Sequence, residues 1–171
     1  MIRQATEEDF SAILDIYQRA RQFMRETGNP TQWGDNHPAK DLLEDDIHQG
    51  QLYVFLEEDD IHGVFAFILG EDSTYTNIEQ GSWKSAAPYG TIHRIAASGL
   101  IKGVFDQCIT YCKTQCAHLR IDTHFDNQVM QHLIVKNGFE KRGIIYVEDG
   151  SPRLAYEYEG NADNKKNDFF K

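Results

Sequence analysis

Four acidic or histidine side chains are candidates for proton transfer: Glu79, His93, Asp122 and His124. A general base works best when its pKa lies near the working pH, and a histidine meets that condition without any perturbation. His93 also precedes a glycine turn, and Glu79 lies in a long loop that could cover a substrate. We therefore expect His93 or Glu79 to act as a general base. The alternative for His93 is a half-buried strand residue held by a backbone carbonyl.

Asp122 and His124 belong to a segment of alternating polar residues. Side chains alternate along a strand, so these two fall on the same face of the strand predicted over residues 118–124. The segment is not a calcium-binding loop of the EF-hand type, because the central glycine and the distal glutamate are missing. We expect a hydrogen-bonding or substrate-binding role here rather than a metal site.

The segment around Gly103 predicts an anion-binding site. Residues 90–97 form a predicted strand, residues 98–103 a turn, and residues 104–117 a helix. The first N–H groups of a helix have no partners inside the helix, and the helix dipole is positive at that end. Both effects favour a phosphate, so we expect the chain to bind a phosphorylated cofactor.

The three cysteines, Cys108, Cys112 and Cys116, are spaced four residues apart. This spacing predicts that all three lie on one face of the helix that follows the turn. A metal or redox cluster is one interpretation. A buried stripe of small residues continuing Val104 is the interpretation we favour, because cysteine is among the most buried residue types and no CxxC pair is present.

An alternating order of strands and helices must position these residues. Strands are predicted over residues 2–5, 52–56, 61–69, 90–97, 118–124, 141–147 and 153–159. Two helices lie between the first two strands, the second with Pro38 in its first turn. Another helix follows the turn at Gly103, and a fourth ends at Gly138-Phe139. This order predicts an α/β (α+β) fold with a mixed central sheet of about seven strands and flanking helices.

Length and charge narrow the function classes. The 171 residues predict one domain over residues 1–159 and a polar C-terminal tail over residues 160–171. The formal net charge of −10 argues against nucleic acid or an anionic membrane as a partner. No apolar run is long enough for a membrane helix, and the N-terminus has no apolar signal region, so we expect a cytoplasmic protein.

The ordered set of elements resembles the GNAT superfamily, whose members transfer an acyl group from acyl-coenzyme A to an amine. The resemblance covers about residues 1–159. It rests on the strand His93-Arg94-Ile95-Ala96-Ala97, the turn Lys102-Gly103, the segment from Asn127 to Gly138-Phe139, and the opening Ile2-Arg3-Gln4-Ala5-Thr6-Glu7-Glu8-Asp9.

The resemblance implies where acetyl-coenzyme A would bind. The backbone of Ile95 and Ala97 would pair with the pantetheine arm, and the Ala97 N–H would hold the oxyanion of the reaction. Asn127 would contact the cofactor, cap its helix, or do both. No metal is expected, because forming an amide does not require one. The pyrophosphate would lie in the turn formed by Leu100, Ile101, Lys102, Gly103 and Val104.

The sequence departs from the family pattern at two places. The phosphate turn usually carries Arg or Gln and then Gly or Ala where this chain has Leu100 and Phe105. Phe105 is therefore expected to be bulky where a phosphate should approach the backbone. The tyrosine that often protonates the leaving thiolate is replaced by Ile134. Another group then supplies that proton, or none is needed, or catalysis has been lost.

The sequence gives the least information about the site that would bind the acceptor. The residues expected to line this site are Trp33, Tyr75, Trp83, Asp122, His124 and Tyr146. For the four aromatic residues, the alternative is a role in packing only. Arg94 is expected either to bind a substrate carboxylate or, more commonly, to form a salt bridge.

We therefore expect an acyl-coenzyme A-dependent N-acyltransferase, with acetyl as the transferred group. Its acceptor would be the primary amine of a small molecule or of an N-terminus, which attacks the thioester directly. Two alternatives stay open. One is a non-enzymatic module on the same fold that binds or senses coenzyme A, and the other is a homodimeric interaction protein whose cofactor site has decayed. A homodimer is compatible with either interpretation.

Overall fold

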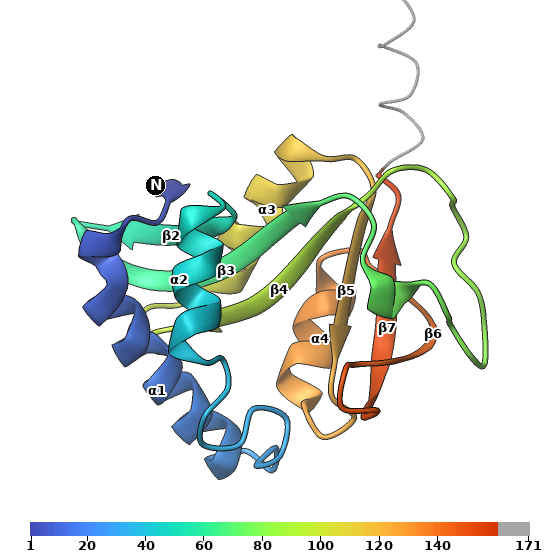
Figure 1. The fold of residues 1–171 in the computed structure, drawn as a ribbon, viewed down its shortest axis with the longest axis horizontal. Coiled ribbons are helices and arrows are strands. Elements are labelled where there is room, and N and C mark those ends of the chain that lie inside the picture. The colour runs from blue at the N-terminus through green and yellow to red at the C-terminus, as the bar shows by residue number, and fades with distance from the viewer. Residues whose placement is uncertain (161–171) are drawn as a thin grey trace, which may run out of the picture.

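A seven-stranded sheet runs through the molecule in the order β1-β2-β3-β4-β5-β7-β6 (Figure 1). It is seen in a computed structural model that describes residues 1–160. All neighbouring strands are antiparallel except β4 and β5, which are parallel, so the predicted mixed sheet is confirmed. The strands are β1 (Ile2–Gln4), β2 (Leu52–Glu57), β3 (Asp60–Leu69), β4 (Gly90–Ala97), β5 (Leu119–Thr123), β6 (Glu140–Tyr146) and β7 (Pro152–Tyr158).

Four α-helices cover the sheet, and each contributes one apolar stripe to a core. Helices α1 (Phe10–Glu26) and α2 (Lys40–His48) pack on one face with β2 and β3, where Tyr17 and Leu43 are fully buried. Helices α3 (Val104–Gln115) and α4 (Gln128–Lys136) pack in a separate core with the other face. Two short 3₁₀ helices, Glu7–Asp9 and Ser73–Tyr75, complete the secondary structure of residues 1–160.

Two predicted helix boundaries were wrong. Helix α2 begins at Lys40, after Pro38 rather than around it. Helix α3 ends at Gln115, and Cys116 is extended with φ −151°, so it does not continue the helical stripe. Cys108 and Cys112 are buried thiols as expected, whereas Cys116 is half-buried. Burial raises the pKa of the Cys108 thiol to about 12, which makes it unreactive.

A bulge in β4 turns the middle of that strand. Arg94 and Ile95 together lie opposite Phe65 of β3, and Arg94 has a φ of 53°, a left-handed conformation that is uncommon outside glycine. The Tyr17 hydroxyl donates a hydrogen bond of 2.6 Å to the Arg94 carbonyl. This contact joins α1 to the strained residue and stabilises the bend.

The long loop between β3 and β4, residues 70–89, is fixed to the sheet by one buried carboxylate. Glu157 of β7 accepts hydrogen bonds from the backbone N–H of Lys84 at 2.9 Å and from Nε of Arg142 at 3.0 Å. It also lies 2.7 Å from Nε2 of His118. The guanidinium of Arg120 stacks between two aromatic rings of the loop, each about 4.0 Å away: Trp83 and Tyr89. These contacts hold the loop against β5, β6 and β7.

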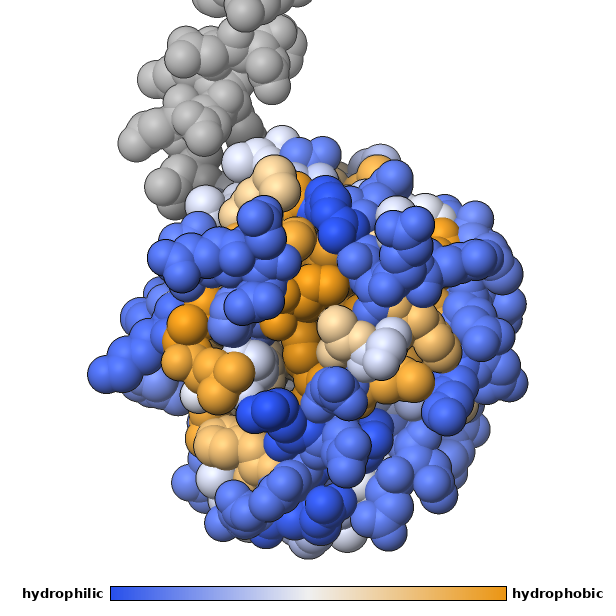
Figure 2. All heavy atoms as spheres, turned by 90° about the vertical axis from the view of Figure 1, so that its left-hand side faces the viewer, coloured by the Kyte–Doolittle hydropathy of each residue, from blue (hydrophilic) through white to orange (hydrophobic). Residues whose placement is uncertain are grey.

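The remaining expectations from the sequence concern membrane helices, oligomeric state, location in the cell and the C-terminal tail. In the part of the chain that the structure describes, no helix is long and apolar enough to cross a membrane. Figure 2 shows the side of the molecule at the left of Figure 1, where apolar side chains reach the surface between hydrophilic ones. The homodimer and the cytoplasmic location remain predictions. The predicted C-terminal tail lies outside the described residues, apart from Gly160.

Candidate active site

The divergence of β4 and β5 opens a cavity. The two strands pair only at Gly90 with Leu119 and at Thr91 with Arg120. Beyond that point they separate, as Figure 1 shows, and a cavity of about 670 Å³ fills the space. It is lined by β4 and β5, by the segment between α1 and α2, by the start of loop 70–89, and by the β6–β7 turn.

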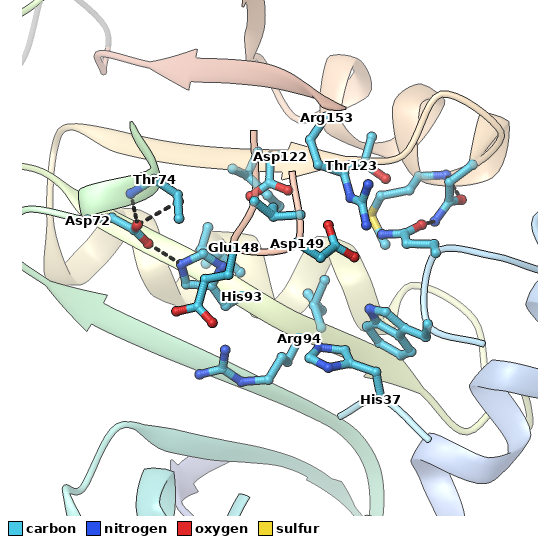
Figure 3. Close-up of a pocket in the computed structure, with 18 of the residues that line it drawn as sticks. His37, Asp72, Thr74, His93, Arg94, Asp122, Thr123, Glu148, Asp149 and Arg153 are labelled. Atoms are coloured by element: carbon cyan, nitrogen blue, oxygen red, sulfur yellow. Dashed lines mark hydrogen bonds and ion pairs between the residues drawn. The ribbon is translucent and has the colours of Figure 1, made fainter. Parts of the chain in front are cut away.

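His93 lines this cavity and is held by an aspartate from the loop (Figure 3). Its Nε2 lies 2.7 Å from Oδ2 of Asp72, and the other oxygen of that carboxylate accepts hydrogen bonds from the backbone and hydroxyl of Thr74. The contact with His93 lowers the pKa of Asp72 below its ordinary value, so this carboxylate is ionised. Because a carboxylate only accepts, Nε2 carries the hydrogen, and Nδ1 of a neutral His93 is left as the basic atom.

Asp122 lines the cavity on the β5 side. The hydroxyl of the fully buried Tyr75 donates a hydrogen bond of 2.6 Å to its Oδ1. Burial and the nearby Asp122 charge raise the pKa of Tyr75 well above its usual value, so the phenol remains a donor. The centroid of the Tyr75 ring lies 6.0 Å from that of the His93 ring. Tyr75, which binds Asp122, and His93, which binds Asp72, are therefore neighbours.

Arg94 also lines the cavity, and the salt-bridge alternative is confirmed for it. Its guanidinium forms two parallel hydrogen bonds with the buried carboxylate of Asp46 on α2, at 2.9 and 3.0 Å. In this bidentate geometry each charged group is neutralised by the other. Arg94 is therefore a structural link between β4 and α2.

The predicted cofactor residues surround an open turn at the end of β4. Gly103 has a φ of 77°, and no atom of residues 1–160 lies within 4 Å of the position that a side chain would take. No side chain in the described part of the chain caps α3, so the first N–H groups of this helix are left without a capping side chain there. Past Thr91, the edge of β4 that faces β5 has no strand partner among the described strands, which leaves Ile95 and Ala97 on an unpaired edge. These features fit a phosphate and an extended arm at the proposed cofactor site.

Asn127 caps its helix, so one of its two interpretations is confirmed. Its Oδ1 accepts a hydrogen bond from the N–H of Met130, the third residue of α4. Its Nδ2 donates to Oε1 of Gln32, in the segment between α1 and α2. Asn127 also lines the cavity, so a contact with a bound cofactor stays a prediction.

The departures from the family pattern have different consequences. The side chain of Phe105 is buried in the core with α3, so its bulk is turned away from solvent at the turn. Leu100 is exposed within the turn and supplies no polar group there. Ile134 is fully buried in the same core as Phe105. No hydroxyl is available at that position of α4.

The remaining predicted site residues are divided between the cavity and other places. Trp33 lines the cavity and packs edge-on against Tyr17. His124 lies at the end of β5, where its Nδ1 accepts a hydrogen bond from the N–H of Asp126. Trp83 packs on Tyr75 and does not line the cavity.

Glu79 and Tyr146 are placed together, away from the cavity. The Tyr146 hydroxyl donates a hydrogen bond of 2.9 Å to Oε2 of Glu79 on the surface. The backbone of Glu79 pairs with Ile144 of β6 through two hydrogen bonds of 2.8 Å. This part of the loop therefore extends the sheet edge rather than covering the cavity.

His37, Asp72 and Arg153 are among the cavity residues that were not identified from the sequence. Asp72 precedes Ser73 and Thr74, and this local pattern predicts a capped turn but not a contact with His93. Within residues 1–160, no group of three or more His, Cys, Asp or Glu side chains is arranged to hold a metal ion.

Comparison with known proteins is informative at the level of structure. No protein-family model matches the chain, and no curated protein matches its sequence. A GNAT-family acetyltransferase from Streptococcus agalactiae 2603 superposes with a TM-score of 0.82 and 29% identity, over 94% of this chain and 95% of that one. A putative acetyltransferase from Staphylococcus aureus Mu50 has a TM-score of 0.65 and 26% identity, over 93% and 98% of the two chains.

A more distant structure shares the fold. The putative acetyltransferase yncA from Salmonella typhimurium, solved with its cofactor acetyl-CoA, has a TM-score of 0.61 and 14% identity, over 95% of this chain and 94% of that one. The same mixed sheet and flanking helices recur in all three.

Proposed function

Because the chain belongs to the GNAT superfamily of acetyltransferases, we propose that it transfers an acetyl group from acetyl-coenzyme A to a primary amine. The acceptor would be a small molecule or a free N-terminus. The carrying observation is the His93–Asp72 pair on one wall of the cavity that the divergence of β4 and β5 opens. The acetyl-CoA in the related yncA structure supports the choice of donor.

The residues of the cavity have distinct roles in this proposal. The unpaired edge of β4 at Ile95 and Ala97 would bind the extended arm of the donor, and the turn from Leu100 to Val104 would bind its phosphates. A neutral amine would attack the thioester carbonyl, forming a C–N bond, and the tetrahedral oxyanion would be held by backbone N–H groups of β4. Asp72 keeps the hydrogen on Nε2, so Nδ1 of His93 can accept the proton that the amine loses.

Collapse of this intermediate breaks the C–S bond and releases coenzyme A as a thiolate. Ile134 offers no proton at the usual position. The imidazolium formed on His93, or water, would return the proton to sulfur. Thiolates are better leaving groups than alkoxides, so the missing tyrosine does not stop the reaction.

The missing tyrosine at position 134 also supports a second candidate function, the binding or sensing of coenzyme A without catalysis. The side chain of Ile134 is apolar and buried, and Leu100 gives the phosphate turn no cation or amide. A module that binds or senses coenzyme A without transferring the acetyl group would tolerate both changes. The His93–Asp72 pair favours the enzyme, because a sensor needs no oriented base in the cavity.

The deciding experiment has two readouts on the full chain. Calorimetry with acetyl-coenzyme A measures donor binding, and a thiol-release assay with a panel of amines measures transfer. Binding together with amine-dependent thiol release supports the enzyme. Binding without thiol release from any amine supports the sensor, and a folded protein that fails to bind the donor at millimolar concentration contradicts both.

A further inference from the structure

Arg153 is a buried cation of the cavity wall that forms no ion pair with any acidic side chain of residues 1–160. Its residue is only 8% exposed, and it lines the cavity from the start of β7. The one hydrogen bond that its guanidinium makes within residues 1–160 is a local bond of 3.0 Å to the carbonyl of Pro152. Figure 3 shows the guanidinium turned into the cavity, on the side where Thr123 and Asp149 lie.

The other buried or half-buried arginines that line the cavity or contact Glu157 have carboxylates beside them. Arg94 pairs with Asp46, and Arg142 and Arg120 lie 3.0 and 3.6 Å from Glu157. Arg153 forms no ion pair within the described residues. A guanidinium does not lose its proton in a protein, and burying it without a counter-charge is unfavourable. Its position is therefore best explained by an anion that arrives with a ligand.

The position of Arg153 in the sheet indicates which ligand brings that anion. Leu154 and Tyr156 of β7 point into the core formed with α3 and α4. Because side chains alternate along a strand, Arg153 points to the opposite face. Helix α3, which follows the proposed phosphate turn, packs in the same core as Leu154 and Tyr156, so Arg153 and that turn lie on opposite faces of the sheet. An anion carried by the acceptor therefore fits Arg153 better than the phosphates of the donor.

The groups around Arg153 leave its charge available. Burial, followed by the charges of Arg94 and Arg153, lowers the pKa of His37, so this cavity histidine is neutral at physiological pH and adds no second cation. Hydrogen bonds from Ser151, and to a smaller extent the charge of Arg153, lower the pKa of Asp149. Asp149 is exposed, and its Oδ1 accepts a hydrogen bond from the N–H of Ser151. Asp149 and Arg153 do not form an ion pair.

We propose that the acceptor is an amine that also carries a carboxylate, and that Arg153 binds this carboxylate while the amine faces His93. The guanidinium and carboxylate fit each other through two parallel hydrogen bonds, which fixes orientation as well as charge. This inference rests on the proposed acetyl transfer for its amine end. The smallest molecules with both groups are free amino acids.

The test compares L-amino acids with their carboxamides, which keep the amine and remove the negative charge. Each is titrated calorimetrically into the protein saturated with coenzyme A and is also assayed as an acceptor. We expect the acid to bind and react at least about tenfold better than its amide, the effect of a charge-assisted hydrogen-bonded pair. Arg153→Met should remove this preference, and Arg153→Lys should keep part of it. Arg19→Met, an exposed arginine on α1, is the matched control.

Each outcome bears on the proposal. Equal binding of acids and amides to the wild-type protein, or binding of neither, overturns it, and this comparison stands even if Arg153→Met fails to fold. A loss in Arg153→Met that is the same for acid and amide also overturns it. Acid-selective binding without any acetylation leaves the role of Arg153 intact and contradicts the proposed transfer instead, because calorimetry reads the carboxylate contact without the reaction.

Discussion

Oδ2 of Asp72 lies 2.7 Å from Nε2 of His93, although the two residues are 21 positions apart in the sequence. The contact joins the start of loop 70–89 to the middle of β4. It fixes both the orientation of the imidazole and the nitrogen that carries the hydrogen. The Asp72 carboxylate accepts hydrogen bonds from the backbone N–H and the hydroxyl of Thr74, and the Asp72 backbone N–H donates to the Tyr89 hydroxyl. The group that orients the base is therefore itself held in place.

Replacement of His93 should remove the base, and the same change at Glu79 should not. We expect His93→Gln to lower kcat/KM by roughly 10²- to 10⁴-fold, the usual contribution of a general base. Glu79→Gln should stay near the wild-type rate, because Glu79 is bonded to Tyr146 outside the cavity. Steady-state kinetics over a range of pH measure both. A wild-type rate and an unchanged acidic limb in His93→Gln would exclude it as the base and make Asp122 the next candidate.

Asp72→Asn should slow the reaction by reversing the tautomer of His93. The carboxylate can only accept a hydrogen bond from Nε2, whereas an amide can present its own N–H to Nε2 and leave the hydrogen on Nδ1. We expect kcat to fall by about tenfold or more, as measured by steady-state kinetics. Thr74→Val is the control, since it removes one hydrogen bond to the carboxylate but keeps the charge. If Asp72→Asn keeps the wild-type rate, Asp72 does not position the base.

Gly103→Asp should weaken binding of acetyl-coenzyme A far more than Gly103→Asn. Both side chains have nearly the same size, and the φ of 77° strains both backbones similarly, with Asn and Asp tolerating it better than other residues. Only Asp adds a negative charge where the phosphates are proposed to lie. Calorimetry should show at least a tenfold larger dissociation constant for Asp than for Asn. Equal constants would move the phosphate site away from this turn.

Glu157→Gln should destabilise the fold at neutral pH. Burial alone would raise the pKa of Glu157, but the hydrogen bonds from His118, Lys84 and Arg142 outweigh it and lower the pKa. Removing the charge leaves buried cations without their partner, which costs about 3 kcal/mol, or roughly 6–12 °C in Tm for a chain of this size. Glu140→Gln is the control, because Glu140 also pairs with Arg142 but is exposed.

The same carboxylate predicts a pH dependence with a definite sign. A group whose pKa is lowered in the folded state contributes its stability above the unfolded value, about 4.3 for a glutamate, and loses it as the pH falls through the folded value. The Tm of the wild type should therefore decline below about pH 4.3, and its advantage over Glu157→Gln should shrink there. Thermal melts of the two proteins between neutral and acidic pH measure this. A constant difference across that range would contradict the ionised cluster.

The fold was predictable from the sequence because its signals are local. Periodic apolar residues predicted the helices, and glycine turns marked the ends of several elements, such as the turn at Gly103 between β4 and α3. The predicted end of α3 was wrong, because the helical spacing of Cys116 from Cys112 does not continue the helix. The backbone of Cys116 is extended. The buried side chain of Phe105 could not be foreseen either, because its direction depends on how α3 packs on the sheet.

The site was predictable only in part, because its contacts are not local. His93 could be selected from its residue type and its strand, but its partner Asp72 reaches it across a loop whose path no sequence pattern encodes. Arg94 and Arg153 look alike in the sequence. The structure separates them, since a bulge and α2 bring Asp46 to Arg94, whereas Arg153 forms no ion pair within residues 1–160.

The close contact between loop 70–89 and strand β6 limits how this scaffold can be recombined. A side chain at Gly81 would lie 1.8 Å from the carbonyl of Arg142, and one at Gly143 would lie 2.5 Å from the carbonyl of Glu79. Glycine is therefore needed at both positions for the two segments to pack this closely. A chimera that takes the β6–β7 hairpin from a relative must also take loop 70–89 from the same relative. Because this loop carries Asp72, we expect the two regions to be exchanged together.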